Sequence, residues 1–279
     1  MKKIYFNIIY IALITLFSCE KTIVIDSQQS AASVVIEGLI TDQPGKQYVK
    51  VSKTSDFYQD GTTERIVNAT VVINDDKGNE TPFIHNPSGD EKTEGYYYPN
   101  NAFTGDAGHI YSLSVLVDGD LYTAEDKLLP VTTIDSLSYR VNDDEKEDPK
   151  ITGKFYELLA YMKEPQETKD YYLFKFYRND SITYYLRNSD IYFTDDTGIG
   201  EDIDGIPSPV FFAINDVAKM EIYSLSRNAY LFYNDLFNLI NNDGGMISPP
   251  PVNPRSNLSN GALGFFRTSS VHSASIQIK

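Results

Sequence analysis

Short runs in which apolar and polar residues alternate fill much of the chain from Ser33 to Leu129, and this period of two predicts β-strands. Turn-forming residues separate the runs, for example Asp42 to Gly45. Asp118-Gly119 lies between two such runs, a pattern that predicts a β-hairpin. The expected strands cover residues 34–40, 47–52, 69–74, 110–117 and 121–124. We therefore expect residues 33–130 to form an Ig-like antiparallel β-sandwich domain.

The second half of the chain keeps this strand pattern and adds one helix. Its expected strands cover residues 155–162, 171–177, 182–186, 191–194 and 220–225. After Ser226 the apolar residues recur every three or four positions, which predicts a helix near residues 227–241. Ser226 can cap its start, and the glycine and proline residues from Gly244 to Pro251 end it. Its apolar face consists of Tyr230, Tyr233, Leu236, Phe237 and Ile240. We expect residues 131–279 to form a second β-rich domain, and we favour core packing for this face over a cofactor slot.

The first 19 residues have the organisation of a lipoprotein export signal. Two lysines precede an apolar run from Ile4 to Phe17, and Leu16 to Cys19 resembles a lipobox, the site at which lipoprotein signal peptidase cuts. The run is too short to span a bilayer comfortably, which makes a permanent transmembrane helix the weaker interpretation. We predict that residues 1–18 are a lipoprotein signal peptide and that Cys19 is lipidated, with an ordinary secreted protein as the alternative. Residues 19–32 would then form a lipidated tether.

Charge and cysteine content narrow the function classes. The formal charge is −15, and removing residues 1–18 takes away two lysines and leaves −17. Such a balance argues against nucleic acid as a partner and against electrostatic adhesion to anionic lipid. Membrane attachment would therefore depend on acyl chains at Cys19. Because Cys19 is the only cysteine, no intramolecular disulfide can form, and packed cores must stabilise the exported protein.

Local motifs for catalysis are absent from the sequence. The three histidines, His85, His109 and His272, lie far apart and lack metal-ligand spacing. The chain has no Gly-x-Ser-x-Gly motif, no His-Glu-x-x-His motif and no phosphate-binding glycine loop. A Ser/His/Asp arrangement could still assemble from distant residues, so a hydrolase remains the least favoured alternative. We predict a protein that is not an enzyme and has no catalytic residues.

One acidic segment is a candidate metal site. Carboxylates spaced by glycines could surround a hard cation such as Ca²⁺ with oxygen ligands, although the spacing does not match an EF-hand. In so acidic a chain, a solvated surface loop is the favoured interpretation. The candidate ligands are Asp195, Asp196, Glu201, Asp202 and Asp204.

Two segments are candidate binding surfaces. Tyr96, Tyr97 and Tyr98 could stack on a sugar ring, although the absence of tryptophan weakens a glycan-binding hypothesis. The segment from Gly244 to Gly264 is rich in proline, glycine and asparagine, which is typical of either a recognition loop or disorder. The candidate contact residues in this segment are Asn253, Arg255 and Asn257.

Several segments together resemble a known family. The first is Val34 to Asp42, and the most distinctive is Asn257 to Phe266, where glycines precede Phe266. The remaining ones are Asn68 to Ile73, Gly95 to Tyr97, Gly108 to Leu113, Tyr122 to Ala124 and Ile134 to Leu137. In this order they resemble a Bacteroidota lipoprotein family described as domain of unknown function 4249.

This resemblance implies a location and a partner. Such proteins are outer-membrane lipoproteins, often encoded beside a TonB-dependent transporter, and the N-terminal half looks like the transthyretin-like modules of these transporters. No ligand or catalytic residues are implied. We therefore expect a lipid-anchored protein of the outer membrane, facing the cell surface, that is an accessory or binding partner of a TonB-dependent nutrient transporter. The alternatives are a glycan-binding lipoprotein and a structural or adhesive lipoprotein of the envelope.

Overall fold

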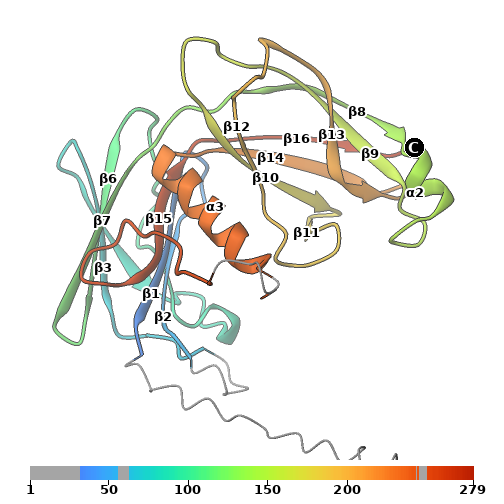
Figure 1. Ribbon diagram of the computed structural model, residues 1–279. Helices are drawn as coiled ribbons and strands as arrows, with labels where there is room; N and C mark the ends of the chain where they lie inside the picture. The colour runs from blue at the N-terminus through green and yellow to red at the C-terminus, as the bar shows by residue number, and fades with distance from the viewer. Residues whose placement is uncertain (1–31, 56–62, 243, 245–249) are drawn as a thin grey trace, which may run out of the picture. The chain divides into compact units, whose positions relative to one another are not determined.

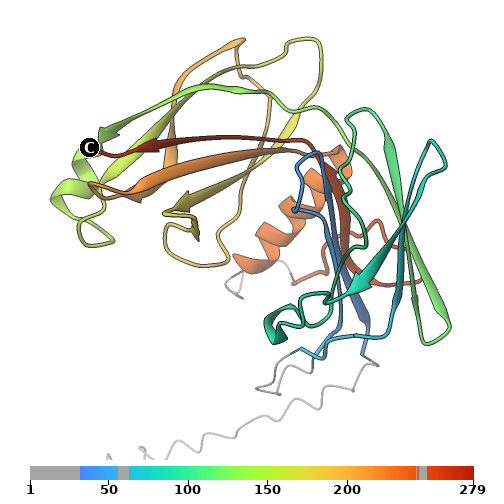
Figure 2. The same ribbon diagram turned by 180° about the vertical axis from the view of Figure 1, so that it is seen from behind.

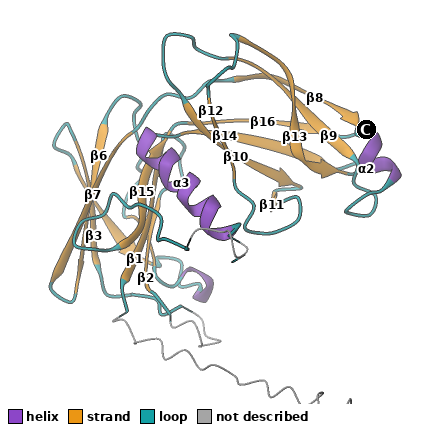
Figure 3. Ribbon diagram, viewed as in Figure 1, coloured by secondary structure: helices purple, strands orange, loops and turns teal. Residues whose placement is uncertain are grey.

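The computed structural model describes residues 32–55, 63–242, 244 and 250–279. The predicted signal peptide (residues 1–18), Cys19 and all but the last residue of the predicted tether lie outside the described residues. The described part of the chain consists mainly of β-strands, as Figure 3 shows, and this confirms the predicted β-rich fold class.

Seven strands of the N-terminal half and β15 from the distal end of the chain form one eight-stranded sheet with the order β15-β1-β2-β5-β4-β3-β6-β7. Its neighbouring strands are antiparallel, except that β1 and β15 are parallel. The predicted hairpin is confirmed: β6 and β7 are joined by Asp118 and Gly119, which both have positive φ angles. The strands are β1 (Val34–Thr41), β2 (Tyr48–Lys53), β3 (Thr70–Asp75), β4 (Glu80–His85), β5 (Tyr96–Pro99), β6 (Ile110–Val117), β7 (Asp120–Lys127) and β15 (Leu263–Ser269), and a 3₁₀ turn covers Glu91–Thr93.

Strand β15 shows that the sheets do not follow the expected division at residue 130. It comes from the distal end of the chain, yet it pairs with β1 over seven residue pairs from Val35–Leu263 to Thr41–Ser269. Its other side approaches β7, where Thr268 N–H donates a hydrogen bond to the buried Asp126 carboxylate at 2.8 Å. The two ends of the sheet are thus brought together around one apolar core, which includes Ile36, Leu113 and Phe266. Local sequence pattern cannot reveal this pairing because the partners are more than 220 residues apart.

The remaining strands form two further sheets that face each other. One has the order β11-β10-β14-β16, with β12 beside β11 on the same edge of β10, and the other has the order β13-β9-β8. Strands β8 and β16 lie together, and the backbone N–H of Ile134 donates to Nδ1 of His272. Figures 1 and 2 show this arrangement from two sides. The strands are β8 (Ile134–Val141), β9 (Tyr156–Lys163), β10 (Tyr171–Arg178), β11 (Ser181–Thr183), β12 (Tyr192–Asp195), β13 (Asp202–Phe212), β14 (Val217–Ser224) and β16 (Val271–Gln277).

Two α-helices complete the described structure. The short helix α2 (Asp143–Glu147) follows β8, and α3 (Arg227–Ile240) lies where the helical period predicted it. The side chain of Ser226 accepts a hydrogen bond from Ala229 N–H, so the predicted cap is confirmed. Aromatic residues of α3 pack on the core beside β10, and the ring centroids of Tyr230 and Tyr171 are 4.8 Å apart. Tyr230 and Tyr233 of the predicted apolar face therefore pack on this core, whereas Phe237 remains 41% exposed, and the residues of this face also line cavities.

Candidate functional site

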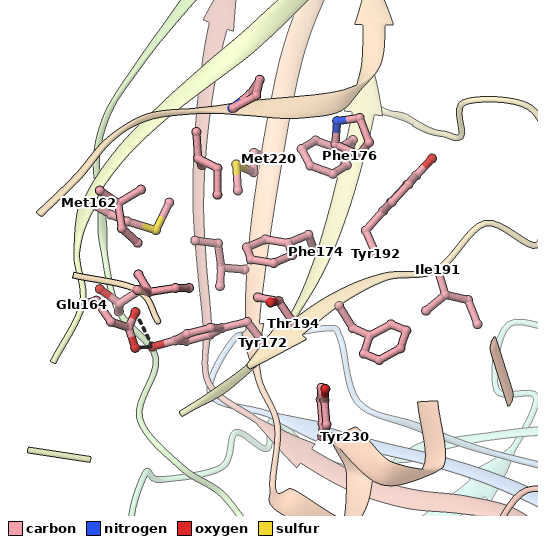
Figure 4. Close-up of a pocket in the computed structure, with 18 of the residues that line it drawn as sticks. Met162, Glu164, Tyr172, Phe174, Phe176, Ile191, Tyr192, Thr194, Met220 and Tyr230 are labelled. Carbon is pink, nitrogen blue, oxygen red and sulfur yellow. Dashed lines mark hydrogen bonds between the residues drawn. The ribbon is translucent and has the colours of Figure 1, made fainter. Parts of the chain in front are cut away.

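An apolar cavity of about 580 Å³ lies between the two C-terminal sheets, at the end where β13 faces β10 and β12. Figure 4 shows side chains from several elements converging on it. Most of its walls are aliphatic or aromatic. Strands and helix supply Met162, Tyr172, Phe174, Phe176, Tyr192, Phe193, Thr194, Ile203, Ile206, Pro207, Pro209, Met220, Ile222, Tyr230, Asn234, Phe237 and Asn238, and connecting segments supply Thr132, Glu164, Ile191 and Ile199.

Strand alternation explains how one wall of the cavity arises. Successive side chains of a strand point to opposite faces, so Tyr172, Phe174 and Phe176 share one face of β10. In the register with β14, Phe174 lies opposite Ile222 and Phe176 lies opposite Met220. The sequence pattern therefore produces a continuous apolar wall from two adjacent strands.

The opposite wall is an irregular edge strand. Strand β13 pairs with β9 but shifts register twice, between Asp204 and Ile206 and between Pro207 and Phe211. Proline lacks a backbone donor and is accommodated at sheet edges and bulges, which is the position that β13 occupies. Its glycine and prolines are also the reason that no strand is predicted here from the sequence. The irregular pairing leaves space between the sheets.

The polar end of the cavity is a carboxylate–phenol pair. The hydroxyl of Tyr172 donates to both oxygens of Glu164, at 2.9 and 3.0 Å, as the dashed lines in Figure 4 mark. Burial raises the pKa of the Glu164 carboxyl, and the nearby charges of Asp170 and Asp196 act in the same direction, opposed by the Tyr172 hydrogen bond. Burial and the Glu164 hydrogen bond raise the pKa of the Tyr172 phenol, so this phenol remains a donor. The pair can thus hold a polar group at one end of an otherwise apolar ligand.

The predicted metal loop is not one loop in the structure. Asp195 ends β12, whereas Asp202 and Asp204 lie in β13 with exposed side chains. Asp196 accepts hydrogen bonds from Lys169 Nζ at 2.6 Å and from the backbone of Asp170 at 2.7 Å. Within the described residues, the only group of three acidic or histidine side chains close enough to share a cation is Glu164, Asp170 and Asp196, which retains only Asp196 of the predicted set. The five predicted ligands therefore do not form one coordination sphere, because they are spread over the end of β12, the connecting segment and the start of β13.

The three tyrosines of β5 do not share one surface. Tyr97 is buried, and its hydroxyl donates to Ile66 O and accepts from Ala69 N–H, both at 2.9 Å. The side chains of Tyr96 and Tyr98 lie on the other face, half-buried, with nearly parallel rings whose centroids are 6.2 Å apart. Tyr97 is thus a core residue, and only Tyr96 and Tyr98 remain candidates for stacking on a ligand.

Of the three candidate contacts near the C-terminus, the structure brings Asn253 and Arg255 to one cavity and gives Asn257 a different position. Asn257 has a structural position, since its amide bonds both backbone groups of Phe266 and the carbonyl of Glu125. Arg255 binds both carboxylate oxygens of Asp235 on α3. Asn253 lines a cavity on the β1 side of α3 and, together with Arg255, another cavity beside Asp235. The part of this segment at 245–249 lies outside the described residues.

The comparison with known families gives one match. The family model described as "Domain of unknown function (DUF4249)" matches residues 20–275. The chain belongs to the DUF4249 family. No curated protein matches it. In the described part of this DUF4249 protein, no helix is long and apolar enough to cross a membrane.

The sequence did not single out the residues at the polar end of the DUF4249 cavity. Glu164 follows β9 and Tyr172 lies in β10, and neither belongs to a recognisable motif. One signal was present: an aromatic residue at every second position of β10, which predicts an apolar face but not what lies opposite. The facing sheet and the Glu164 contact depend on tertiary structure.

Proposed function

We propose that this DUF4249 protein is a non-catalytic, lipid-anchored ligand-binding protein of the outer membrane in a Bacteroidota cell, acting as an accessory of a TonB-dependent nutrient transporter. The observation that carries the binding role is the cavity of about 580 Å³, which falls in the size range of small-molecule sites and has mainly apolar walls. Its Glu164–Tyr172 pair would orient one polar end of the ligand. The ligand class that fits is a small, mainly apolar molecule with one hydrogen-bonding group.

A binding role agrees with the chemistry of the cavity better than a catalytic one does. Among the described lining residues, the titratable side chains are Glu164 and the tyrosines Tyr172, Tyr192 and Tyr230. The Glu164 carboxylate already receives the Tyr172 hydroxyl, and the hydroxyl of Tyr192 accepts a hydrogen bond from the backbone of Tyr185. Burial raises the pKa of Tyr192 to about 12, so this phenol stays neutral at physiological pH. Glu164, Tyr172 and Tyr192 are thus engaged in hydrogen bonds, an arrangement that favours binding over the presentation of an activated nucleophile with its base.

Filling the cavity is expected to weaken the binding of an apolar probe strongly. The chain has no tryptophan, so a single introduced indole both fills space and serves as a unique fluorophore. In Ile203→Trp, on the β13 wall, the affinity for the neutral apolar probe N-phenyl-1-naphthylamine should fall at least tenfold, because the indole occupies probe volume. The measurement is probe fluorescence titrated against the chain from Glu20 onward, which lacks the lipidation residue Cys19 and therefore needs no detergent.

The matched control is Leu121→Trp, which places the same indole at a side chain that is 53% exposed in the N-terminal sheet. Its probe affinity should equal that of the wild type, and its indole should transfer little energy to the bound probe. Equal affinities in both variants and the wild type would show that the probe binds elsewhere, and the cavity would then lose its proposed role. Thermal melts check that both variants fold.

The transporter partnership is tested in the producing cell. Protein with its native N-terminus is captured from mildly solubilised outer membranes, and mass spectrometry identifies the lipid on Cys19 and the copurified proteins. A TonB-dependent transporter in stoichiometric amount is the expected result. Cys19→Ser is the control. This variant should carry no lipid and should no longer be found in the membrane fraction. Recovery of the lipidated protein alone would contradict the accessory role and favour an independent envelope role.

A glycan-binding role has one observation in its favour. The nearly parallel rings of Tyr96 and Tyr98 are partly exposed on the outer face of β5, and Nζ of Lys50 lies 5.7 Å from the Tyr96 ring centroid. Flat aromatic side chains of this kind can stack on sugar rings. We rank this role second because the two rings present a surface, whereas the apolar cavity offers walls from several strands and a helix.

A further inference from the structure

A second hollow lies on the β1 side of α3 and differs chemically from the apolar cavity. Two adjoining cavities of about 380 and 410 Å³ both include Glu37, Tyr233 and Leu236 in their walls, and together we call them the α3 crevice. The first of them shares no lining residue with the apolar cavity, whereas the second has Phe174, Phe176, Ile191 and Tyr192 in common with it. Its walls are largely apolar and aromatic, with Tyr48, Phe232 and Phe265 among them.

The α3 crevice contains a buried arginine without an anionic partner. Arg267 on β15 is only 6% exposed and lines the first cavity. Within the described residues its side chain makes one hydrogen bond, from Nη1 to Ser269 Oγ at 2.8 Å, and no ion pair. The guanidinium otherwise lies beside aromatic rings, 5.1 Å from the centroid of Tyr223 and 5.8 Å from that of Tyr233. A guanidinium has five donors, so most of its hydrogen-bonding capacity is free to meet a ligand.

A second cation lies close to Arg267. Lys175 on β10 lines the other cavity, and its Nζ is 5.0 Å from the same Tyr223 ring centroid. Burial lowers the pKa of Lys175 to about 8, and the charge of Arg267 contributes in the same direction. In the described part of the chain, Lys175 also has neither an ion pair nor a side-chain hydrogen bond. Arg267 and Lys175 thus lie beside the same ring, as does Lys46. Glu221, the register partner of Lys175, acts against the lowering of its pKa, but within the described residues neither Arg267 nor Lys175 forms an ion pair.

The nearby carboxylates are already committed to other cations. Glu221 binds Lys46 and Lys219, with Nζ–O distances of 2.9 and 3.0 Å. Glu37, which lines both cavities, pairs with Lys50 at 2.8 Å. In a protein of formal charge −15, this leaves a local excess of positive charge inside an aromatic pocket. Burying a charge without a partner is costly, so such an arrangement is expected where a ligand supplies the counter-charge.

We propose that the α3 crevice binds an organic carboxylate, with its carboxylate held by Arg267 and Lys175 and its apolar body against the aromatic walls. Arginine suits this task because its planar donors match the two oxygens of a carboxylate. Asn253, a candidate from the sequence, lines the same cavity and can supply an amide to the ligand. Tyr48, whose ring centroid is 5.6 Å from that of Tyr96, connects the crevice to the exposed Tyr96–Tyr98 pair. This site goes beyond the apolar-ligand function proposed above and does not depend on it.

The test compares soluble carboxylates with their neutral counterparts. Protein purified from the producing cell is titrated by calorimetry with 3-phenylpropionate, 4-phenylbutyrate and indole-3-acetate, with 4-phenyl-1-butanol as the uncharged isostere, and with inorganic phosphate. We expect one-to-one binding of at least one aromatic carboxylate, at least tenfold tighter than the alcohol and than phosphate. If no carboxylate binds at concentrations up to 10 mM, or if the alcohol or phosphate binds equally well, the proposal is wrong.

Variants locate the binding within the crevice. Arg267→Gln should weaken carboxylate binding at least tenfold, and Lys175→Gln several-fold. Lys169→Gln is the matched control, since Lys169 also lies over a tyrosine ring, 5.8 Å from the centroid of Tyr171, but is paired with Asp196 outside the crevice. Unchanged affinity in folded Arg267→Gln protein would overturn the assignment. Because Arg267 packs on two rings, the Arg267→Gln variant could fail to fold. In that case acylation of Lys175 in the wild-type protein, detected by peptide mass spectrometry, tests the proposal. 4-Phenylbutyrate should protect Lys175 from acylation, and 4-phenyl-1-butanol should not.

Discussion

Replacing Gly264 with alanine is expected to lower the free energy of unfolding by at least about 4 kcal/mol, which places this change among the most destabilising single substitutions. Gly264 has a φ angle of +96°, and a Cβ atom there would lie 2.1 Å from the backbone carbonyl oxygen of Ile36. Ile36 and Gly264 are register partners in the parallel β1–β15 pair. Backbone atoms cannot move aside as a flexible side chain can, so alanine should separate the two strands. Urea denaturation followed by far-UV circular dichroism measures the loss.

The control for Gly264→Ala isolates the clash from the backbone strain. Gly108 has a similar φ angle of +93°, but a Cβ atom there would meet nothing within 4 Å. Gly108→Ala should therefore cost only about 1 kcal/mol, the usual penalty for placing a side chain at positive φ. Equal losses in the two variants would mean that the close contact between β15 and β1 is not what requires glycine.

Replacing Glu221 with glutamine is expected to cost about 3–5 kcal/mol, the usual effect of removing one partner from a buried ion pair. The Glu221 side chain is 2% exposed, and its oxygens accept hydrogen bonds from Lys46, Tyr177 and Tyr223 and form an ion pair with Lys219. An amide would place an N–H₂ group against these donors and would leave the cations without a counter-charge. Because Lys46 lies between β1 and β2 and Glu221 lies in β14, the change weakens the contact between two sheets.

Glu221 also predicts the direction of one pH effect. Burial alone would raise the pKa of its carboxyl, but the hydrogen bonds from Tyr223, Lys46 and Lys219 outweigh burial and hold the pKa at about 2, compared with 4.5 for an unperturbed glutamate. Between these two pH values the unfolded chain binds a proton that the folded protein does not. The contribution of Glu221 is therefore complete above about pH 4.5 and is lost as the pH falls toward 2, a change of about 3 kcal/mol.

The difference between wild type and Glu221→Gln isolates this effect from other carboxyls. Burial raises the pKa of Asp126 to about 6, so Asp126 contributes in the opposite direction between pH 4 and 6 in both proteins, and its effect cancels in the comparison. Glu64→Gln is the surface control, because Glu64 pairs with Lys53 at 2.7 Å while its side chain is 66% exposed. Its loss should stay below about 1 kcal/mol. If the wild type and Glu221→Gln lose stability in parallel down to pH 2.5, the low pKa of Glu221 is refuted.

Features that depend on neighbouring residues were predictable from the sequence. The alternating runs predicted β1, β2, β3, β6, β9, β10 and β14 to within a few residues, and Asp118-Gly119 predicted the hairpin between β6 and β7. The change of period after Ser226 predicted α3 and its cap. These features are set by backbone preferences and by the side-chain period of one element. Successive side chains of a strand point to opposite faces. A strict period of two would therefore also have predicted that Tyr96 and Tyr97 lie on opposite faces of β5.

The candidate sites were less predictable because they combine distant elements. The acidic segment suggested a loop, but its second half is an edge strand that tolerates Pro207 and Pro209 through its bulges. Asn257 suggested a contact surface, but it bonds the backbone at Phe266 and Glu125. In both cases the residue types suggested a binding role, whereas the fold places the residues in a strand or in hydrogen bonds to the backbone.

The sequence by itself determined the strand-rich character of this DUF4249 protein, its helix, its acidity and the organisation of its N-terminal segment, because each of these depends on composition or on short-range period. Only the tertiary structure decided that β15 returns to pair with β1, that β13 faces β10 across an apolar cavity, and that Arg267 and Lys175 meet at Tyr223. The physical reason is that these contacts are selected by the burial of whole faces and by the pairing of backbone groups far apart in the chain. A local sequence pattern shows that a strand or helix has an apolar face, but it does not show which other element packs against that face.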